Sequence, residues 1–178
     1  MARLIWLMGA SGAGKDSLLN ALREQPPEGM LVAHRYITRP ADAGGENHIA
    51  LTESEFQRRR AYGLFALDWQ AHQTAYAVGI EVDIWLARGW NVMVNGSRQH
   101  LPQAQQRYAS RLFPLCLQVS PAILEARLRQ RGRESEQQIA RRLRRAQETT
   151  LPDCPQLNND GALNDTLNAL RHLLGATP

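Results

Sequence analysis

The chain has 178 residues, of which 43% are hydrophobic, and this suits one globular domain with a large core. No apolar stretch approaches the ~18 residues of a membrane-spanning helix, and the short apolar run at the N-terminus is not typical of a signal peptide. The formal net charge of +4 and the pI near 9.6 favour an anionic partner, either nucleic acid or a small anionic molecule.

The N-terminal segment predicts a strand, a glycine-rich loop and a helix in succession. Residues 4–8 are apolar and read as a buried parallel strand, and residues 16–24 place three leucines on one side of a helix that ends before Pro26 and Pro27. Between them lies the sequence Gly9-Ala10-Ser11-Gly12-Ala13-Gly14-Lys15, which fits G-x-x-x-x-G-K. In this motif backbone N–H groups surround nucleotide phosphates, and the lysine reaches the β and γ phosphates. Lys15 is also the only lysine in the chain.

The residue after Lys15 departs from the motif, which has Ser or Thr there to bind Mg²⁺. Here Asp16 stands in that place, and Ser17 follows it. A carboxylate is a hard oxygen ligand that suits Mg²⁺, and an acidic side chain is stabilised at a helix N-terminus. We therefore expect Asp16 and Ser17 to serve the metal.

Downstream, apolar runs and capping signals alternate along the chain. Further strands are predicted over residues 30–34, 64–69, 90–94 and 112–119. Further helices are predicted from a capping box at Thr52 through Arg60, over 80–88, from Ser120 as N-cap through Arg131, from Ser135 to about Thr149, and along the stripe Leu163, Leu167, Leu170 and Leu174. Residues 42–45 read as a mobile turn. Strands alternating with helices predict an α/β fold with a mainly parallel sheet, with ligands at the carboxyl ends of its strands.

The arginines fall into two groups. One lies at Arg35 and Arg39, and the other spans residues 127–145 on two predicted helices joined at Gly132. Such a helical pair could close over ATP and contact the transferring phosphoryl group. For Arg129, Arg133, Arg141, Arg144 and Arg145 we favour a solvated face paired with nearby glutamates. A nucleic-acid surface is disfavoured, because no lysines or aromatic residues accompany these arginines.

No general base stands out, since the five histidines are scattered and none forms a recognisable pair with Ser, Cys or Asp. An alcohol acceptor usually needs a carboxylate to take its proton, whereas a phosphate acceptor is already ionised. The sequence therefore favours phosphoryl transfer onto a phosphate. The two cysteines, Cys116 and Cys154, have neither metal-ligand nor redox spacing, so we expect reduced thiols in a cytoplasmic protein.

Five motifs in order resemble the guanylate-kinase branch of the P-loop kinases over nearly the whole chain. They are the loop at residues 9–15, Ile37-Thr38-Arg39-Pro40, Gly45-Glu46 with Phe56, residues 127–132 with 139–143, and Asn159-Asp160. The resemblance implies a single domain with a parallel core (about 1–33, 90–125 and 150–178), an acceptor-binding region (about 34–89) and a helical lid (about 126–149). It also implies that Arg39 holds an acceptor phosphate, that Arg131 and Arg142 act on the transferring group, and that Asn159 lies near the adenine.

The departures from that branch lie where guanine and the phosphate of GMP would bind. They include Ala41-Asp42-Ala43 in place of a second arginine, Asp68 in place of Glu, Tyr76-Ala77-Val78 in place of Tyr-Gly-Thr, and Asn95 in place of Asp. Together with Gly14-Lys15-Asp16-Ser17 and Val94-Asn95-Gly96-Ser97-Arg98, they resemble the ribose 1,5-bisphosphate phosphokinases of phosphonate breakdown. That resemblance implies ATP and Mg²⁺ as cofactors, a sugar phosphate as acceptor, 5-phosphoribosyl 1-diphosphate (PRPP) as product, and Arg98 as a further acceptor candidate.

Three alternatives stay open from the sequence: guanylate kinase itself, a guanylate-kinase-like module that binds protein without catalysis, and a basic nucleic-acid binder. The intact Lys15 loop argues against the second. We expect no nucleic-acid or membrane partner, and the oligomeric state, including a homodimer, is left open.

Overall fold

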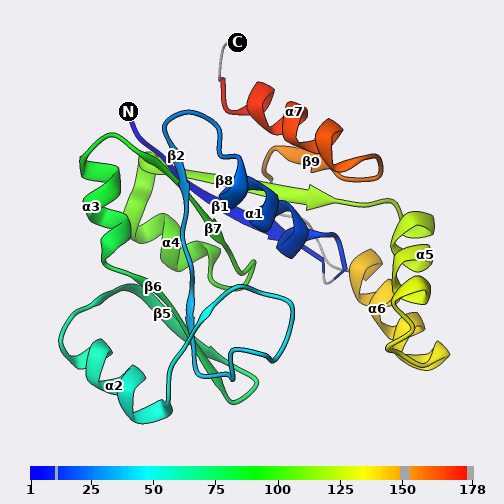
Figure 1. The fold of residues 1–178 in the computed structure, drawn as a ribbon, viewed down its shortest axis with the longest axis horizontal. Helices are drawn as coiled ribbons and strands as arrows, with labels where there is room; N and C mark the ends of the chain where they lie inside the picture. The colour runs from blue at the N-terminus through cyan, green and yellow to red at the C-terminus, as the bar shows by residue number, and fades with distance from the viewer. Residues whose placement is uncertain (11, 149–152, 176–178) are drawn as a thin grey trace.

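The structure, a computed structural model, describes residues 1–10, 12–148 and 153–175. At its centre is a five-stranded parallel sheet, the core sheet, with the strand order β2-β7-β1-β8-β9 (Figure 1). Its strands are β1 Leu4–Gly9, β2 Met30–Val32, β7 Asn91–Asn95, β8 Leu112–Gln118 and β9 Gln156–Asn158. The predicted α/β fold with a parallel sheet is confirmed, although β2 ends two residues before the predicted limit at His34.

Helices cover both faces of the core sheet because alternate residues of β1 point to opposite sides. Leu4, Trp6 and Met8 pack with α3 (Glu81–Ala87) and α4 (Leu101–Tyr108). Ile5 and Leu7 pack with α1 (Lys15–Glu24) and α7 (Leu163–Leu173). The side chains of Leu4 to Met8 in β1 are completely buried, so the strand that leads into the glycine loop lies in the centre of the core.

A second, four-stranded sheet lies beside the core sheet, in the order β4-β3-β6-β5 (Figure 1). Its strands are β3 Tyr36–Ile37, β4 Ile49–Ala50, β5 Phe65–Ala71 and β6 Thr74–Gly79. The helix α2 (Glu53–Ala61) packs on it through Phe56. The predicted cap at Thr52 is confirmed, since its side chain accepts a hydrogen bond from the Glu55 N–H at 3.2 Å.

The last structural unit is the helix pair α5 (Pro121–Arg131) and α6 (Glu136–Glu148), which pack together through Leu124, Leu128 and Ile139. Arg129 forms ion pairs with Glu125 and Glu136, which confirms the prediction of a solvated, paired face for this arginine. The predicted helix end near Thr149 falls outside the described residues. Ser120 occupies the N-cap position of α5, but its side chain makes no capping hydrogen bond, and its N–H instead donates to Asp160 at 2.7 Å.

The sequence did not predict β3, β4, β6, α4, β9 or the short 3₁₀ helix Ala109–Arg111. Within the described residues, no helix has both the length and the apolar character needed to cross a lipid bilayer.

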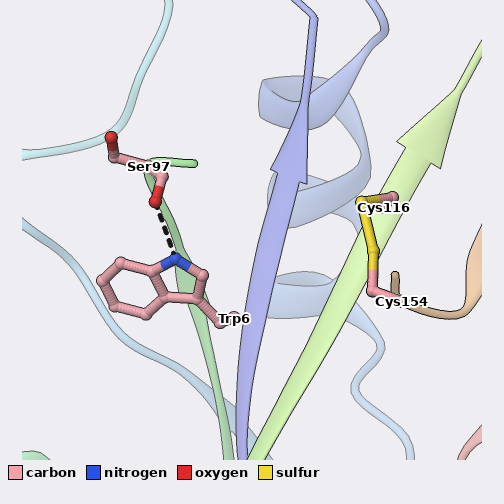
Figure 2. The surroundings of a disulfide bond; sticks show 4 residues. All are labelled: Trp6, Ser97, Cys116 and Cys154. Atoms are coloured by element: carbon pink, nitrogen blue, oxygen red, sulfur yellow. Dashed lines mark hydrogen bonds between the residues drawn. A yellow bond between two sulfur atoms is a disulfide. The ribbon is translucent and has the colours of Figure 1, made fainter. Parts of the chain in front are cut away.

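The structure joins Cys116 and Cys154 in a disulfide (Figure 2). The prediction of two reduced thiols is therefore wrong for this structure. The residues are 38 positions apart in sequence, yet the segment before β9 runs along β8, and the Cys116 N–H donates to the Pro155 carbonyl at 2.9 Å. The pairing of β9 with β8 places the two Cα atoms 6.5 Å apart, within the usual range for a disulfide.

Candidate active site

The glycine loop follows β1 at the carboxyl end of the core sheet, as predicted, and leads into the N-terminus of α1. Gly12 and Gly14 have φ values of +92° and +95°, which L side chains rarely adopt. Gly9 lies against β8, where a Cβ atom would come within 3.0 Å of the Leu117 carbonyl oxygen. The backbone N–H groups at the start of α1 and the helix dipole make this loop an anion-binding site. Ser11 of the motif lies outside the described residues.

Asn159 supports this loop through its buried side chain. Its Nδ2 donates to the Ala13 carbonyl at 2.8 Å, and its Oδ1 accepts from the Thr166 hydroxyl at 2.7 Å. A Cβ atom on Gly14 would lie 2.5 Å from Asn159 Nδ2, so only glycine fits there. Asn159 thus lies directly beside the predicted nucleotide site, and its amide holds the loop backbone.

Lys15 is surrounded by protein and by both signs of charge. Burial, with the nearby Arg35 guanidinium, lowers the pKa of the Lys15 ammonium from 10.5 to about 8, while Asp16 and Glu46 partly offset this effect. An anion bound at the loop would stabilise the protonated form, because opposite charges nearby favour ionisation. Lys15 is therefore a cation whose charge responds to what the loop binds.

Three polar side chains form a connected group next to Lys15. Arg35 donates twice to Glu46, from Nε at 2.8 Å and from Nη2 at 2.5 Å, and Asn95 donates to Glu46 Oε1 at 2.8 Å. Burial opposes ionisation of Glu46, but the hydrogen bonds and charge of Arg35, with Arg39 and Asn95, bring the pKa of its carboxyl below the usual value. From the sequence, Arg35 was one of the grouped arginines and Glu46 was part of a family motif, but their ion pair was not predicted, since nothing in their spacing of 11 residues indicates one.

Two cavities meet at this group. The smaller, of about 270 Å³, is lined by Ala10, Gly12, Gly14, Lys15, Asp16, Ser17, Arg39, Gly45, Glu46, Asn95 and Arg131. The larger, of about 480 Å³, lies between the loop, the second sheet and α6, and is lined by Gly9, Ala10, Lys15, Arg35, Trp69, Ala71, Tyr76, Asn95, Gly96, Ser97, Arg98, Arg142, Arg145 and Ala146. Lys15 and Asn95 line both, so one elongated ligand could extend from one cavity into the other.

The predicted arginines divide between these cavities. Arg39 and Arg131 line the smaller one, whereas Arg98 and Arg142 line the larger one. Arg142 also forms an ion pair with Glu134 at 2.5 Å. The Nε atoms of Arg39 and Arg98 are buried without a hydrogen-bond partner in the described part of the chain. The structure thus brings all four arginines to the phosphate loop, on two sides of Lys15.

The loop that carries Arg39 is held in place by a buried histidine. The His48 ring nitrogens lie 3.0 Å from the carbonyl oxygens of Arg39 and Glu46. This contact fixes the positions of the two residues relative to each other. His48 thus has a structural role in this loop.

Asp16 and Ser17 both line the smaller cavity, where they were expected to serve Mg²⁺. Asp16 Oδ2 lies 2.9 Å from where a Cβ atom on Gly45 would be, so the carboxylate reaches the loop of Arg39. Across residues 1–10, 12–148 and 153–175, no three His, Cys, Asp or Glu side chains gather as a metal site. A carboxylate and a hydroxyl suit Mg²⁺ that is held mainly by phosphate oxygens and water.

Comparisons with known proteins agree with this geometry. The guanylate kinase family model matches residues 1–177. A ribose 1,5-bisphosphate phosphokinase PhnN from Pantoea vagans is 64% identical over 98% of both chains, and one from Dickeya zeae is 65% identical over 99% of this chain and 95% of its own. Among solved structures, a guanylate kinase from Anaplasma phagocytophilum matches with a TM-score of 0.68 at 16% identity, over 98% of this chain and 85% of its own, which shows the shared fold. The chain belongs to the guanylate kinase family and, within it, to the group of the ribose 1,5-bisphosphate phosphokinases.

Proposed function

We propose that this chain is a kinase that transfers the γ-phosphoryl group of ATP to the 1-phosphate of ribose 1,5-bisphosphate, giving PRPP and ADP. The observation that carries the proposal is the 64% identity, over nearly full length, to a relative named for this acceptor. The site supports it, because the larger cavity is lined by cationic and aromatic side chains and by no carboxylate among the described residues. A sugar bisphosphate has two anionic groups that such a cavity can bind, and it has no nucleobase.

In the proposed reaction an oxygen of the acceptor 1-phosphate attacks the γ phosphorus, and the bond from that phosphorus to the β–γ bridging oxygen breaks. The acceptor oxygen is already ionised at neutral pH, so no side chain needs to remove a proton. Catalysis then depends on position and on charge stabilisation. Lys15 would neutralise the β and γ oxygens, Arg39 would hold the acceptor phosphate, and Arg131 and Arg142 would contact the transferring group.

The proposal includes Mg²⁺, held by Asp16 and Ser17 together with phosphate oxygens, where it would neutralise charge on the nucleotide. Replacing Asp16 with Ser restores the common motif and removes one anionic ligand. We expect Asp16→Ser to raise the Mg²⁺ concentration needed for half-maximal rate by a few-fold. An unchanged Mg²⁺ dependence in steady-state assays would remove Asp16 from the metal site.

The proposal divides the chain as the family resemblance implies. Residues 34–89 would bind the acceptor, residues 126–149 would act as a lid, and the rest would form the core. The enzyme would act in the cytoplasm, where ATP is available, as part of phosphonate breakdown. It would have no nucleic-acid or membrane partner, and sedimentation would decide whether it forms a homodimer. Because a disulfide is unusual in the cytoplasm, the redox state of Cys116 in cells tests that placement.

The deciding experiment measures ATP consumption with Mg²⁺ against ribose 1,5-bisphosphate and GMP in parallel, with identification of the phosphorylated product. Turnover of the sugar bisphosphate to PRPP, with little or none of GMP, is the expected result. GMP is the informative alternative because the family model and the solved relative are those of guanylate kinase. Turnover of GMP alone would overturn the proposal, and ATP binding without turnover of either would point to a different acceptor.

A further inference from the structure

The larger cavity concentrates positive charge. Five of its lining residues are cationic, namely Lys15, Arg35, Arg98, Arg142 and Arg145, and none of its lining residues in the described chain is Asp or Glu. Like charges gathered in a concave site raise its potential and attract anions. The cavity is therefore suited to an anionic ligand. Only one of the five cationic residues, Lys15, belongs to the phosphate loop, so the four arginines need a further explanation.

Arg98 differs from the neighbouring arginines in its partners. Arg35 is paired with Glu46, and Arg142 with Glu134. Arg98 belongs to none of the ion pairs found among the described residues, and its Nε is buried without an acceptor. Burial without a nearby carboxylate lowers the pKa of its guanidinium. A half-buried cation that lacks a counter-charge costs stability unless a ligand supplies that charge.

The backbone at Arg98 is held firmly. Arg98 follows β7, and the preceding Ser97 carbonyl accepts a hydrogen bond from the indole N–H of Trp6 at 3.0 Å (Figure 2). Gly96 lies against the same indole, and a Cβ atom added there would come within 2.5 Å of the ring, so no larger residue fits. Trp6 is fully buried in the core sheet, so the strand end that carries Arg98 cannot shift easily. Such a fixed base suits a binding residue, because little further ordering is needed on binding.

We propose that Arg98 binds the second phosphate of the acceptor, the 5-phosphate that is not phosphorylated in the reaction. This inference rests on the proposed function. The reacting 1-phosphate must lie near Lys15 and Arg39, beside the smaller cavity, and Lys15 and Asn95 connect that position with the larger cavity. The sugar would extend past Asn95, beside the stacked rings of Trp69 and Tyr76, whose centroids are 5.9 Å apart, toward Arg98. Arg98 then selects for an acceptor with two phosphates.

The test compares two acceptors that differ only in that phosphate, ribose 1,5-bisphosphate and ribose 1-phosphate. Arg98→Gln should lower kcat/KM for the bisphosphate by at least about tenfold, because a charge-assisted hydrogen bond is lost. It should change kcat/KM for ribose 1-phosphate by less than about twofold, and Arg98→Lys, which keeps the charge, should recover part of the loss. Arg171→Gln, on the exposed face of α7, is the matched control and should behave as wild type. Equal losses for both acceptors, or no loss for either, would overturn the proposal.

A binding measurement separates this inference from the proposed function. Ribose 5-phosphate carries only the phosphate assigned to Arg98, so calorimetry should detect its binding to the wild type and at least about tenfold weaker binding to Arg98→Gln. Thermal melts of both proteins show whether the variant is folded. If the wild type fails to convert ribose 1,5-bisphosphate, the proposed reaction fails, yet this titration still decides the role of Arg98. Equal affinity in both proteins would refute it.

Discussion

The phosphate loop and the larger cavity lie side by side, yet they are built by different means. The loop is positioned by close packing of backbone: Gly9 against Leu117, and Gly14 against the Asn159 amide. The cavity is formed by charged side chains such as Arg35, whose ion pair with Glu46 links the second sheet to the core. Backbone packing tolerates little change, whereas a few side chains can be exchanged without rebuilding the fold. This contrast explains how one family keeps its donor site and changes its acceptor.

Lys15 is shared by both regions, and its removal should have the largest effect. Lys15→Ala removes a charge that contacts the transferring phosphates, so we expect turnover to fall on the order of 10²-fold or more. The same change removes a buried cation, so the melting temperature without ligand should stay the same or rise. Steady-state kinetics and thermal melts measure the two effects. Near-wild-type turnover would exclude Lys15 from catalysis.

The same contrast separates what the sequence predicted from what it did not. The loop motif is local, and its strand and helix, β1 and α1, were predicted with nearly correct limits. The Arg35–Glu46–Asn95 group depends on contacts between the residue just before β3, a loop and the end of β7, and no local pattern encodes it. The disulfide was missed for the same reason, since β9 has only three residues and its pairing with β8 has no periodic signal. The helix α4 was missed because a proline and three glutamines interrupt the apolar pattern formed by Leu101, Ala104 and Tyr108.

Breaking the disulfide tests how the phosphate loop is supported, because Cys154 lies just before β9 and Asn159, whose amide holds that loop. A cross-link over 38 residues contributes about 2–4 kcal/mol by limiting the unfolded chain, so Cys154→Ser should lower the free energy of unfolding by about that amount. Chemical denaturation with and without reductant measures it, and reduced wild type should match the variant. Two reactive thiols in denatured, unreduced protein would show that the bond does not form in solution.

Asn159→Ala should affect stability and ATP binding together. The change leaves the Ala13 carbonyl and the Thr166 hydroxyl without their buried partner, at a cost of about 1–3 kcal/mol. Because the amide holds the loop, KM for ATP should rise several-fold while KM for the acceptor changes little. Asn168→Ala, at an exposed position of α7, is the matched control. A loss of stability with unchanged KM for ATP would separate the packing of Asn159 from the function of the loop.

The pH dependence of kcat/KM for ATP reports on Lys15, the residue that the phosphate loop and the larger cavity share. Deprotonation of Lys15 should reduce kcat/KM as pH rises through about 8, with roughly a tenfold loss for each further pH unit. The sign for stability is the opposite. The folded state loses this proton near pH 8 and the unfolded state near 10.5, so between these values the unfolded state binds more protons and this group's contribution to stability rises with pH.

Arg35→Gln tests what sets the pH range in which kcat/KM for ATP falls, the descending limb of the pH profile. The substitution removes a cation near Lys15 and leaves the Glu46 carboxylate without its ion-pair partner. Both changes raise the pKa of Lys15. The midpoint of the limb should therefore move to higher pH, even if the absolute rate falls because the acceptor cavity is altered. Arg59→Gln, which removes a surface pair on α2, should leave the midpoint in place. If the limb stays near pH 8 in Arg35→Gln, the charge of the acceptor side does not control Lys15, and the two regions are electrostatically independent.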